Sequence, residues 1–509
     1  MIVVLNFGGQ FAHLIARRVR DLGTRAEILP GDAHIASIRA LAPAGLILSG
    51  SPHSVLERGP LPDKNIFTLG IPVLGICYGH QVIAHLLDGK VAKGVRREFG
   101  KETLHIRKKN ALFKGLATSE IVWFSHGDHV SRLPRGFVTA ASTKHCRHAG
   151  FAEKKRAIYG IQFHPEVTHT EHGKKILSNF TFDICKVRKD WDMRSVADDI
   201  IASIRREIGT EHVLVALSGG VDSLVAATLL HQAVGTRLHA MLVDTGLLRK
   251  GEAESVSRVL RARGFKNLKV VDASRQFMLG LKGVTDPEKK RKLIGRVFID
   301  VFEGALKKEL KRYPITFLAQ GTIYPDRIES AAIGEHAAKI KSHHNLALPK
   351  KMKLKLIEPL KELYKDEVRR VGEGLGIPRA LVWRHPFPGP GLGIRILGEI
   401  TPERLTILRE ADAIFMDELQ ESGEYGKIWQ AFAVLLPIRS VGVMGDARTY
   451  DYMIALRAVD SIDGMSADWH KMPPELLERI ASRIVNSVRG VNRVLYDVTQ
   501  KPPATIEYE

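Results

Sequence analysis

The sequence predicts an α/β fold, with two doubly wound parallel-sheet domains followed by a small α+β domain. From Ile2 to Leu318, short apolar runs of strand length alternate with helical patterns, which is typical of a mainly parallel sheet covered by helices. After a stretch rich in proline and glycine at 385–391, longer helical patterns stand beside a few strands. The 509 residues are enough for about three or four domains that each bury a core.

The first segment, residues 1–190, begins with a strand. A helix is predicted at Phe11–Leu22, because apolar residues recur at positions 11, 14, 15, 19 and 22. Strands are predicted at Ile2–Phe7, Gly45–Leu48, Val73–Ile76 and Ala157–Phe163. The polar stretch Lys186–Asp192 indicates a domain boundary near residue 190.

The second segment, residues 191–384, repeats the α/β pattern after a helix predicted at Val196–Ile208. Strands are predicted at Val213–Leu217, Leu238–Val243, Leu268–Val271 and Ile315–Leu318. Polar triplets follow two of these strands, at 244–246 and 320–322. We expect a ligand there, because doubly wound sheets bind ligands beyond the carboxyl ends of their strands. Residues 334–355 are rich in lysine and histidine without periodicity, and we expect a mobile loop or lid.

The third segment, residues 385–509, starts with the turn-rich junction His385–Leu392. It mixes helices with strands, which predicts a small α+β domain. Helices are predicted at Pro402–Leu419 and Pro474–Arg489, and strands at Ala431–Val434 and Val494–Asp497.

The net charge of +20, from 76 basic and 56 acidic residues, would suit a polyanionic partner. The basic residues, however, are spread in short clusters along the chain, and none is interleaved with aromatic residues as an RNA-stacking surface would be. We therefore expect no nucleic-acid partner. We also expect no membrane partner, because no apolar run approaches the ~20 residues that span a bilayer.

The three cysteines, Cys77, Cys146 and Cys185, occur without a Cys-x-x-Cys pair. Their spacing therefore supports neither a disulfide framework nor a zinc site. The N-terminus, Met1–Leu5, has the pattern of a strand with no basic segment or cleavage site before it, so we expect a cytoplasmic protein.

A strand, a glycine-rich turn and a helix follow one another at 214–230. Glycines let the backbone approach an anion closely, hydroxyls donate to its oxygens, and the helix N-terminus offers free N–H groups. No Gly-Lys-Ser/Thr ends the motif, so it is not a Walker loop. It resembles the signature of ATP pyrophosphatases, which cleave ATP between the α and β phosphates. The resemblance implies an Mg²⁺ ligand at Asp222 and ATP binding by Ser218, Gly219, Gly220, Val221, Asp222, Ser223 and Leu224.

A second reactive motif, Gly75-Ile-Cys-Tyr-Gly79, stands between a predicted strand and a helical pattern. Small residues on both sides permit the strained turn of a nucleophile elbow, and a helix N-terminus favours the thiolate of Cys77. In an extended Phe163-His-Pro-Glu166, His164 and Glu166 project to the same side, so the carboxylate can orient the imidazole.

This arrangement resembles a class I glutamine amidotransferase domain. The resemblance implies a Cys77–His164–Glu166 triad that releases ammonia from glutamine through a thioester on Cys77. It also implies an oxyanion loop at 49–52 and a glutamine pocket lined by Gln81 and residues 125–128.

The third segment resembles the C-terminal domain of the glutamine-hydrolysing GMP synthetase family at His385–Gly391, Ala431–Asp446 and Lys501–Glu509. The resemblance covers the whole chain in the same domain order. It implies a carbon–nitrogen ligase that adenylates XMP with ATP and aminates it to GMP, releasing AMP and pyrophosphate, and that forms a homodimer through the C-terminal domain. It places XMP binding at Arg291, Lys501, Ile506 and Glu507, with Lys365 as a candidate for phosphate stabilisation.

Departures from the family pattern are small. Leu224 stands where many relatives have another serine, and the expected lid lacks the usual paired glycines in His343–Pro349. Ala504 and Tyr508 replace the usual Gly and Trp of the tail, which keeps an aromatic residue but reduces backbone freedom.

Three other interpretations account for part of the sequence. A different ammonia-fed, AMP-forming ligase related to NAD synthetase should lack the tail Lys501–Glu509. A tRNA-modifying pyrophosphatase would suit the positive charge, but it should carry an RNA-binding module or cysteines near the ATP motif. A binding protein without catalysis is disfavoured because both reactive motifs are intact.

Overall fold

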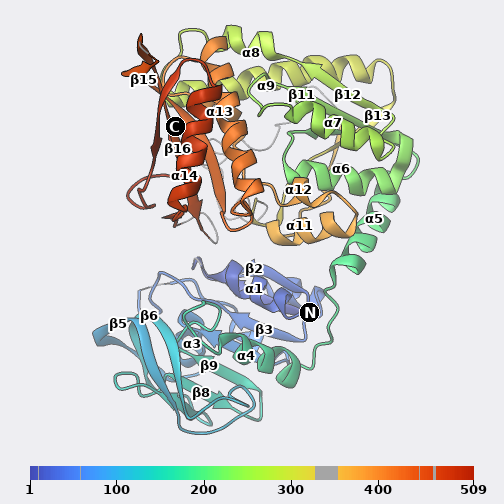
Figure 1. Ribbon diagram of the computed structural model, residues 1–509. Helices are drawn as coiled ribbons and strands as arrows, with labels where there is room; N and C mark the ends of the chain where they lie inside the picture. Colours follow the sequence, from blue (N-terminus) through green and yellow to red (C-terminus); the bar gives the residue numbers. More distant parts are fainter. Residues whose placement is uncertain (10, 58, 327–353, 446, 462–465) are drawn as a thin grey trace. The chain divides into compact units, whose positions relative to one another are not determined.

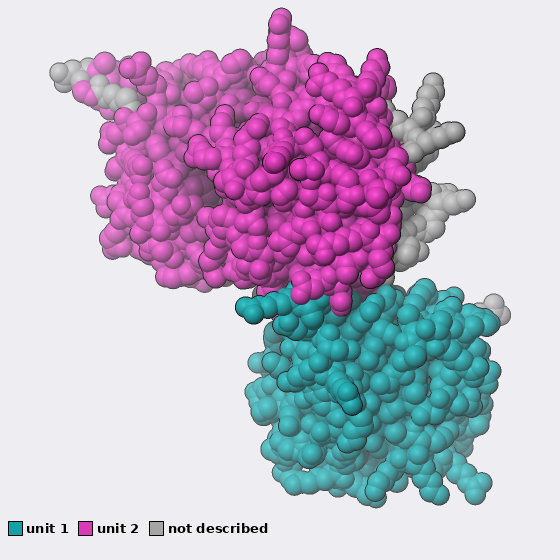
Figure 2. All heavy atoms as spheres, turned by 90° about the vertical axis from the view of Figure 1, so that its right-hand side faces the viewer, with its two compact units in different colours: residues 1–196 teal, residues 197–509 magenta. Residues whose placement is uncertain are grey.

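The computed structural model describes residues 1–509 except 10, 58, 327–353, 446 and 462–465 (Figure 1). The chain divides into two compact units, Met1–Val196 and Ala197–Glu509, which Figure 2 colours separately. The sequence-based division into three domains at 190 and 384 stays a prediction. Residues 334–353 of the expected lid and Asp446 of the C-terminal motif lie outside the described residues.

Unit 1 is built on a nine-stranded sheet with the order β2-β1-β3-β4-β9-β8-β7-β5-β6. Its first five strands are parallel, as the alternating pattern predicts, and most of their residues are buried because helices pack against the sheet. These strands are β1 (Ile2–Asn6), β2 (Ala26–Pro30), β3 (Gly45–Leu48), β4 (Val73–Ile76) and β9 (Ile158–Ile161). The helices are α1 (Ala12–Asp21), α2 (Ile35–Ala40), α3 (Tyr78–Leu86) and α4 (Gly173–Ser178).

Four antiparallel strands extend this sheet, and the sequence analysis did not predict them. They are β5 (Lys90–Ile106), β6 (Ser119–Arg132), β7 (Val138–Ser142) and β8 (Gly150–Glu153). Residues of β6 alternate between buried and partly exposed, so the strand lacks the continuous apolar run that marks the parallel strands.

Unit 2 contains a five-stranded parallel sheet with the order β12-β11-β10-β13-β14. Its strands are β10 (His212–Leu217), β11 (Leu238–Asp244), β12 (Leu268–Asp272), β13 (Ile315–Ala319) and β14 (Lys355–Ile357). The accompanying helices are α5 (Met193–Ile208), α6 (Val221–Val234), α7 (Glu252–Ala262), α8 (Ser274–Leu281), α9 (Pro287–Leu310), α11 (Lys365–Gly374) and α12 (Arg379–Val382). The four strands predicted in this segment are therefore correct within one residue at each end.

A second sheet of unit 2 is built around the long hairpin β15 (Gln430–Met444) and β16 (Ala447–Asp460). The short β17 (Asp468–Trp469) and the parallel β18 (Val491–Tyr496) pair with β16, beside α13 (Pro402–Glu421) and α14 (Pro474–Ser487). One hydrophobic core joins α8 and α9 to α13 and this sheet, with Phe277, Leu408 and Leu456 all fully buried. The shared core explains why residues 197–509 form one compact unit. No helix in the described part of the chain is long and apolar enough to cross a membrane.

Candidate active sites

Cys77 sits at the tight turn between β4 and α3 with φ +55° and ψ −104°, a conformation that non-glycine residues rarely adopt. Its two nearby glycines make the turn possible. A Cβ on Gly75 would lie 2.4 Å from the carbonyl oxygen of Gly79, and a Cβ on Gly79 would lie 2.2 Å from that of Leu48. The nucleophile elbow predicted from the sequence is therefore present, with Cys77 at the N-cap of α3.

The predicted triad residues come together. His164 Nδ1 lies 2.7 Å from Glu166 Oε1, and both side chains are buried. Burial disfavours the imidazolium, but the charges of Glu166 and Cys77 outweigh it and raise the pKa of His164 well above its usual value. The His164 side chain also interacts directly with Cys77. A histidine with a raised pKa beside a cysteine is the arrangement that nucleophilic cysteine catalysis needs.

The loop after β3 approaches this pair. A Cβ on Gly50 would lie 3.4 Å from the His164 ring and 3.8 Å from Cys77 Cβ, so the Gly50 backbone lies directly beside both residues. The Ser49 carbonyl oxygen accepts from Gly79 N at 3.0 Å, which ties this loop to the elbow. Residues 49–52 therefore lie where an oxyanion loop should be.

The residues expected to line a glutamine pocket also lie close to the elbow. The Cys77 thiol lies 3.7 Å from the Ser125 carbonyl oxygen. Gln81 Nε2 donates to the Asp128 carbonyl oxygen at 2.9 Å, and the Asp128 carboxylate accepts from Ser54 in a short hydrogen bond. The segment 125–128 of β6 thus borders the reactive thiol.

In unit 2, the glycine-rich turn lies between β10 and α6. Gly219 has φ +75°, and Gly220 is the N-cap of α6. Ser218 Oγ accepts from Gly220 N at 3.2 Å, and Ser223 Oγ donates to the Gly220 carbonyl oxygen at 3.0 Å. These hydrogen bonds fix the conformation of the turn at the N-terminus of a fourteen-residue helix. The free N–H groups at a helix N-terminus are suited to binding an anion. The Leu224 side chain is buried, so it contributes packing instead of a polar contact.

Asp222 lies in the first turn of α6 and is paired with a lysine from α11. Lys365 Nζ is 2.5 Å from Asp222 Oδ2, while Oδ1 is buried without a hydrogen-bond partner among the described residues. A Cβ on Gly321 would lie 3.3 Å from Ser223 N, so the polar segment that follows β13 packs against the same glycine-rich turn. The structure thus brings Asp222 and Lys365, which were predicted separately from two motifs, together at one place.

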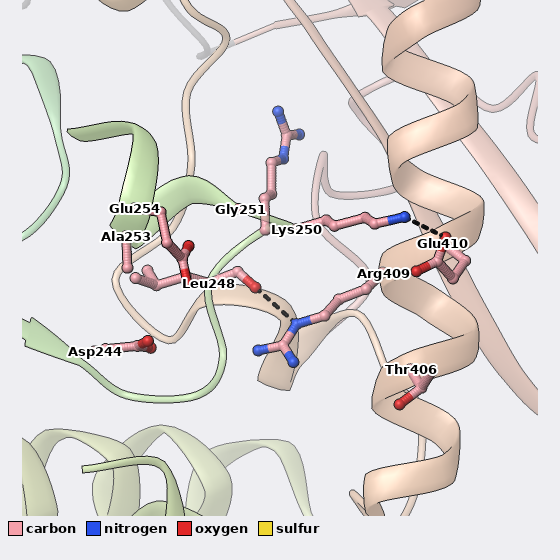
Figure 3. Close-up of a pocket in the computed structure, with 10 residues that line it drawn as sticks. Asp244, Leu248, Lys250, Gly251, Ala253, Glu254, Thr406, Arg409 and Glu410 are labelled. Carbon is pink, nitrogen blue, oxygen red and sulfur yellow. Dashed lines mark hydrogen bonds and ion pairs between the residues drawn. The ribbon is translucent and has the colours of Figure 1, made fainter. Parts of the chain in front are cut away.

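A cavity of about 300 Å³ opens where β11 ends, at the sheet edge where a ligand was expected (Figure 3). Asp244 and Glu254 line it from one side and Arg409 of α13 from the other. Arg409 donates to the carbonyl oxygens of Gly246 and Leu248, so the arginine also fixes the loop after β11. Burial lowers the pKa of Arg409, and the Asp244 carboxylate opposes this shift.

The tail residues predicted to bind XMP are tied into unit 2. Glu507 Oε1 accepts from Arg395 Nη2 at 2.8 Å and from Gln430 Nε2 at 2.7 Å. Ile506 is buried in a cluster with residues of β15 and β16. The Arg291 side chain donates to the backbone carbonyl of Glu509, and the backbone of Lys501 pairs with Ala467.

Sequence reasoning missed three basic residues that hold this tail. Arg395 and Arg457 have fully buried side chains, and Lys290 is equally buried. Arg457 donates to the carbonyl oxygens of Thr499, Thr505 and Ile506, and Lys290 Nζ lies 2.5 Å from Glu509 Oε2. A basic residue inside an apolar strand is the available signal: Arg457 stands among Met, Ile, Ala, Leu and Val in β16.

Comparisons with known proteins identify the family of the chain. Residues 3–184 match the family glutamine amidotransferase class-I, and residues 417–508 match the GMP synthase C-terminal domain. The GMP synthase (glutamine-hydrolyzing) of Aquifex aeolicus is 53% identical over 510 residues, covering 100% of this chain and 99% of that protein. The proteins of the same name from Carboxydothermus hydrogenoformans and Geobacillus kaustophilus are 55% and 53% identical, with the same coverage.

Proposed function

The chain belongs to the family of glutamine-hydrolysing GMP synthases, and from this premise we propose which residues carry each part of the reaction. The enzyme hydrolyses glutamine to ammonia, adenylates XMP with ATP, and aminates the adenylated XMP to GMP, releasing AMP and pyrophosphate. The main support for this assignment is the buried contact between His164 and Glu166. The pair lies beside Cys77, whose backbone has a φ of +55°.

Ammonia is produced in unit 1. The Cys77 thiolate attacks the amide carbon of glutamine, and the backbone beside Gly50 stabilises the oxyanion. The His164 imidazolium gives its proton to the departing nitrogen, so the carbon–nitrogen bond breaks and ammonia leaves a thioester on Cys77. Neutral His164 then takes a proton from water, which attacks the thioester and releases glutamate. Glu166 keeps the imidazole oriented throughout.

Adenylation takes place at the turn formed by Ser218, Gly219, Gly220, Val221, Asp222, Ser223 and Leu224. The oxygen at C2 of XMP attacks the α-phosphorus of ATP, and pyrophosphate leaves toward the backbone N–H groups of the turn and the N-terminus of α6. Ammonia then attacks C2 and displaces AMP. Lys365 lies beside Asp222 and supplies positive charge to the phosphates.

The turn also fits a magnesium ion. Asp222 offers a carboxylate oxygen without a hydrogen-bond partner among the described residues, and carboxylate oxygen is a preferred ligand of Mg²⁺. When bound with ATP, the ion would neutralise phosphate charge. Asp222 is therefore the residue that we assign to the metal.

XMP binding is assigned to Arg291, Lys501, Ile506 and Glu507. Arg291 and Lys501 supply cations near the tail for the nucleotide phosphate. Glu507 is held by Arg395 and Gln430, so its carboxylate is oriented before a ligand arrives. Ile506 packs in a buried hydrophobic cluster with residues of β15 and β16, and this packing positions the backbone of the neighbouring Glu507.

We further propose a cytoplasmic homodimer formed through the C-terminal segment. The distal half of the β15–β16 ribbon exposes the large apolar side chains of Ile438, Val441, Val443 and Tyr450. A group of exposed apolar side chains on one ribbon is a feature of protein interfaces. The oligomeric state in solution, measured by light scattering, tests this assignment.

The activity is tested by following the ultraviolet absorbance of XMP in the presence of ATP, Mg²⁺ and glutamine. The expected result is conversion to GMP, with ammonium salt able to replace glutamine. The absence of GMP with both nitrogen donors over a range of ionic strength would overturn the assignment.

A further inference from the structure

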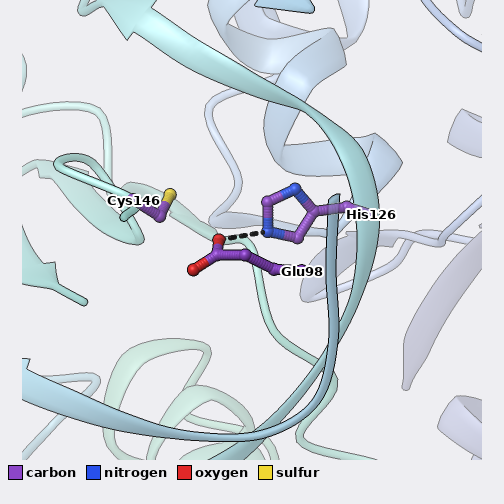
Figure 4. A group of neighbouring side chains, drawn as sticks. All are labelled: Glu98, His126 and Cys146. Atoms are coloured by element: carbon purple, nitrogen blue, oxygen red, sulfur yellow. Dashed lines mark ion pairs between the residues drawn. The ribbon is translucent and has the colours of Figure 1, made fainter. Parts of the chain in front are cut away.

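Three buried side chains with metal-binding atoms meet in unit 1: Glu98, His126 and Cys146 (Figure 4). Glu98 lies on β5 and His126 is its direct cross-strand partner on β6, while Cys146 comes from the loop between β7 and β8. One ligand atom from each residue lies within 4.8 Å of the other two. His126 belongs to the segment 125–128 that is expected to line the glutamine pocket, but none of the three side chains takes part in the proposed steps of glutamine hydrolysis.

The hydrogen bonding of His126 leaves one ring nitrogen facing the carboxylate. Nδ1 lies 2.9 Å from the Asp128 carbonyl oxygen, which can only accept, so Nδ1 carries a proton. Nε2 lies 2.9 Å from Glu98 Oε2, so the imidazole and the carboxylate face each other directly. This nitrogen and this oxygen are close enough to bind one cation between them, with the Cys146 sulfur as a third ligand atom.

Other contacts hold the three side chains in place, as in established metal sites. Thr143 Oγ1 donates to Glu98 Oε1 at 3.2 Å and accepts from Cys146 N at 2.9 Å. The backbone of Thr143 also donates to the Cys146 carbonyl oxygen. A single threonine thus orients both the carboxylate and the loop that carries the thiol, while the Asp128 carbonyl orients His126.

We propose that Glu98, His126 and Cys146 form a binding site for a zinc-type divalent cation. Sulfur, imidazole nitrogen and carboxylate oxygen are the ligands that zinc prefers, and three protein ligands leave a fourth position for water. Zinc bonds of about 2.0–2.3 Å separate tetrahedral ligands by about 3.5 Å. Side-chain movements on the order of 1 Å from the present positions would therefore complete the site.

The spacing of cysteines along the sequence could not predict this site, because its three ligands come from three separate segments of the chain. Mg²⁺ and Ca²⁺ do not suit it, since they prefer all-oxygen ligands. Burial, together with the Glu98 charge, raises the pKa of Cys146 to about 12, so without a metal the residue is an unreactive thiol. The competing interpretation is a metal-free ion pair between Glu98 and His126 with Cys146 packed beside it.

A direct test titrates Co²⁺, a spectroscopic substitute for zinc, into the full-length protein carrying Cys77→Ala. This background removes the reactive thiol of the triad, which could itself bind metal. We expect a thiolate-to-cobalt charge-transfer band that saturates at one ion per chain and disappears when Zn²⁺ displaces Co²⁺. No band, or a band without saturation at one equivalent, would overturn the proposal.

Added substitutions identify the ligand. Cys146→Ser should remove the band, whereas Cys185→Ser, a matched change at the other buried cysteine, should leave it unchanged. Glu98→Gln should retain the thiolate band but weaken Co²⁺ binding by about 10–100-fold. Far-ultraviolet circular dichroism of each metal-free variant establishes that the fold persists, and if Cys146→Ser does not fold, the Cys185→Ser and Glu98→Gln results still decide the site. Loss of the band with Cys185→Ser, or unchanged affinity with Glu98→Gln, would assign the metal to other residues.

Discussion

Cys77, the proposed nucleophile, has a backbone conformation that its glycine neighbours permit. Its positive φ turns the side chain out of the strand-to-helix junction, and its thiol lies beside a histidine whose pKa is raised. The two carboxylate oxygens of Asp222 differ in their contacts. One is paired with Lys365, and the other has no hydrogen-bond partner among the described residues. Three predictions follow from single side chains.

Cys77→Ala should reduce glutamine-dependent GMP synthesis by about a thousandfold or more, because the nucleophile that forms the thioester is lost. Synthesis from ammonium salt should stay within about twofold of the wild type, since adenylation belongs to another site. Initial rates with each nitrogen donor test this. Equal loss with both donors would mean that Cys77 has a structural role.

Glu166→Gln should move the alkaline limb of the glutaminase pH profile to lower pH. Burial lowers the pKa of His164, and the charges of Glu166 and Cys77 raise it above its usual value. Without the Glu166 charge that pKa falls, so the imidazolium that protonates the leaving nitrogen is lost at a lower pH. Glutamate release measured across pH tests this, with ammonia-dependent synthesis as control. An unshifted limb would contradict the assigned role.

Asp222→Asn should lower synthesis by about a hundredfold or more with either nitrogen donor, while glutamine hydrolysis in unit 1 persists. The amide cannot supply the charge that we assign to the magnesium–phosphate complex. Asp366→Asn is a matched control on α11, where the carboxylate pairs with the partly exposed Arg370. Wild-type turnover of the Asp222 variant would refute the assignment.

The backbones of β3, β4 and α3 pack so closely around the turn at Cys77 that a side chain larger than hydrogen does not fit at Gly75 or Gly79. The end of β4 meets the first turn of α3 at Gly75, and the first turn of α3 meets the end of β3 at Gly79. The buried apolar strands β3 and β4 set the distance between these backbones through their parallel pairing. The geometry of the nucleophile therefore depends on element packing as well as on Cys77.

Gly79→Ala should destabilise unit 1 by about 1–3 kcal/mol and strongly reduce glutamine hydrolysis, because the added methyl overlaps the Leu48 backbone. Gly304→Ala is the control: a Cβ there meets nothing within 4 Å inside α9, and alanine favours the helix by about 0.5–1 kcal/mol. Thermal unfolding and glutaminase rates measure both effects. A neutral Gly79→Ala variant would show that the elbow can relax.

For the molecule as a whole, the C-terminal tail is a structural part of unit 2. Its carboxylates and carbonyls satisfy buried basic groups: Arg395 is paired with Glu507, Arg457 with the tail backbone, and Lys290 with Glu509. Deleting residues 501–509 would remove the carboxylate partners of Arg395 and Lys290 and two of the carbonyl partners of Arg457. Loss of XMP binding after such a deletion would therefore not identify a substrate contact by itself.

Glu507→Gln should lower the stability of unit 2 by about 1–3 kcal/mol, because a charged hydrogen bond to the buried Arg395 is weakened. Glu478→Gln, an exposed change on α14, should stay within about 0.5 kcal/mol. Denaturant unfolding measures stability, and XMP titration of the folded variant measures the binding role. Unchanged stability together with lost XMP affinity would make Glu507 a ligand contact without a structural role.

Much of the parallel framework was predictable from the sequence because a strand buried on both faces leaves a continuous apolar run. β3 and β4 begin and end where the apolar runs predict, and α1 differs by one residue at each end. The antiparallel strand β6 was missed because one-sided burial mixes polar and apolar residues. β2 was also not identified, as its short run alternates and ends in Pro30.

The sequence by itself determined the two reactive motifs, since an elbow cysteine and a glycine-rich turn are local: their chemistry depends on neighbouring residues along the chain. Tertiary structure alone decided what surrounds them. It brought His164 to Cys77, Lys365 to Asp222 and Arg395 to Glu507 from segments far apart in the chain. The physical reason is that sheet order and core packing set these distances, and neither is encoded in the local spacing of residues.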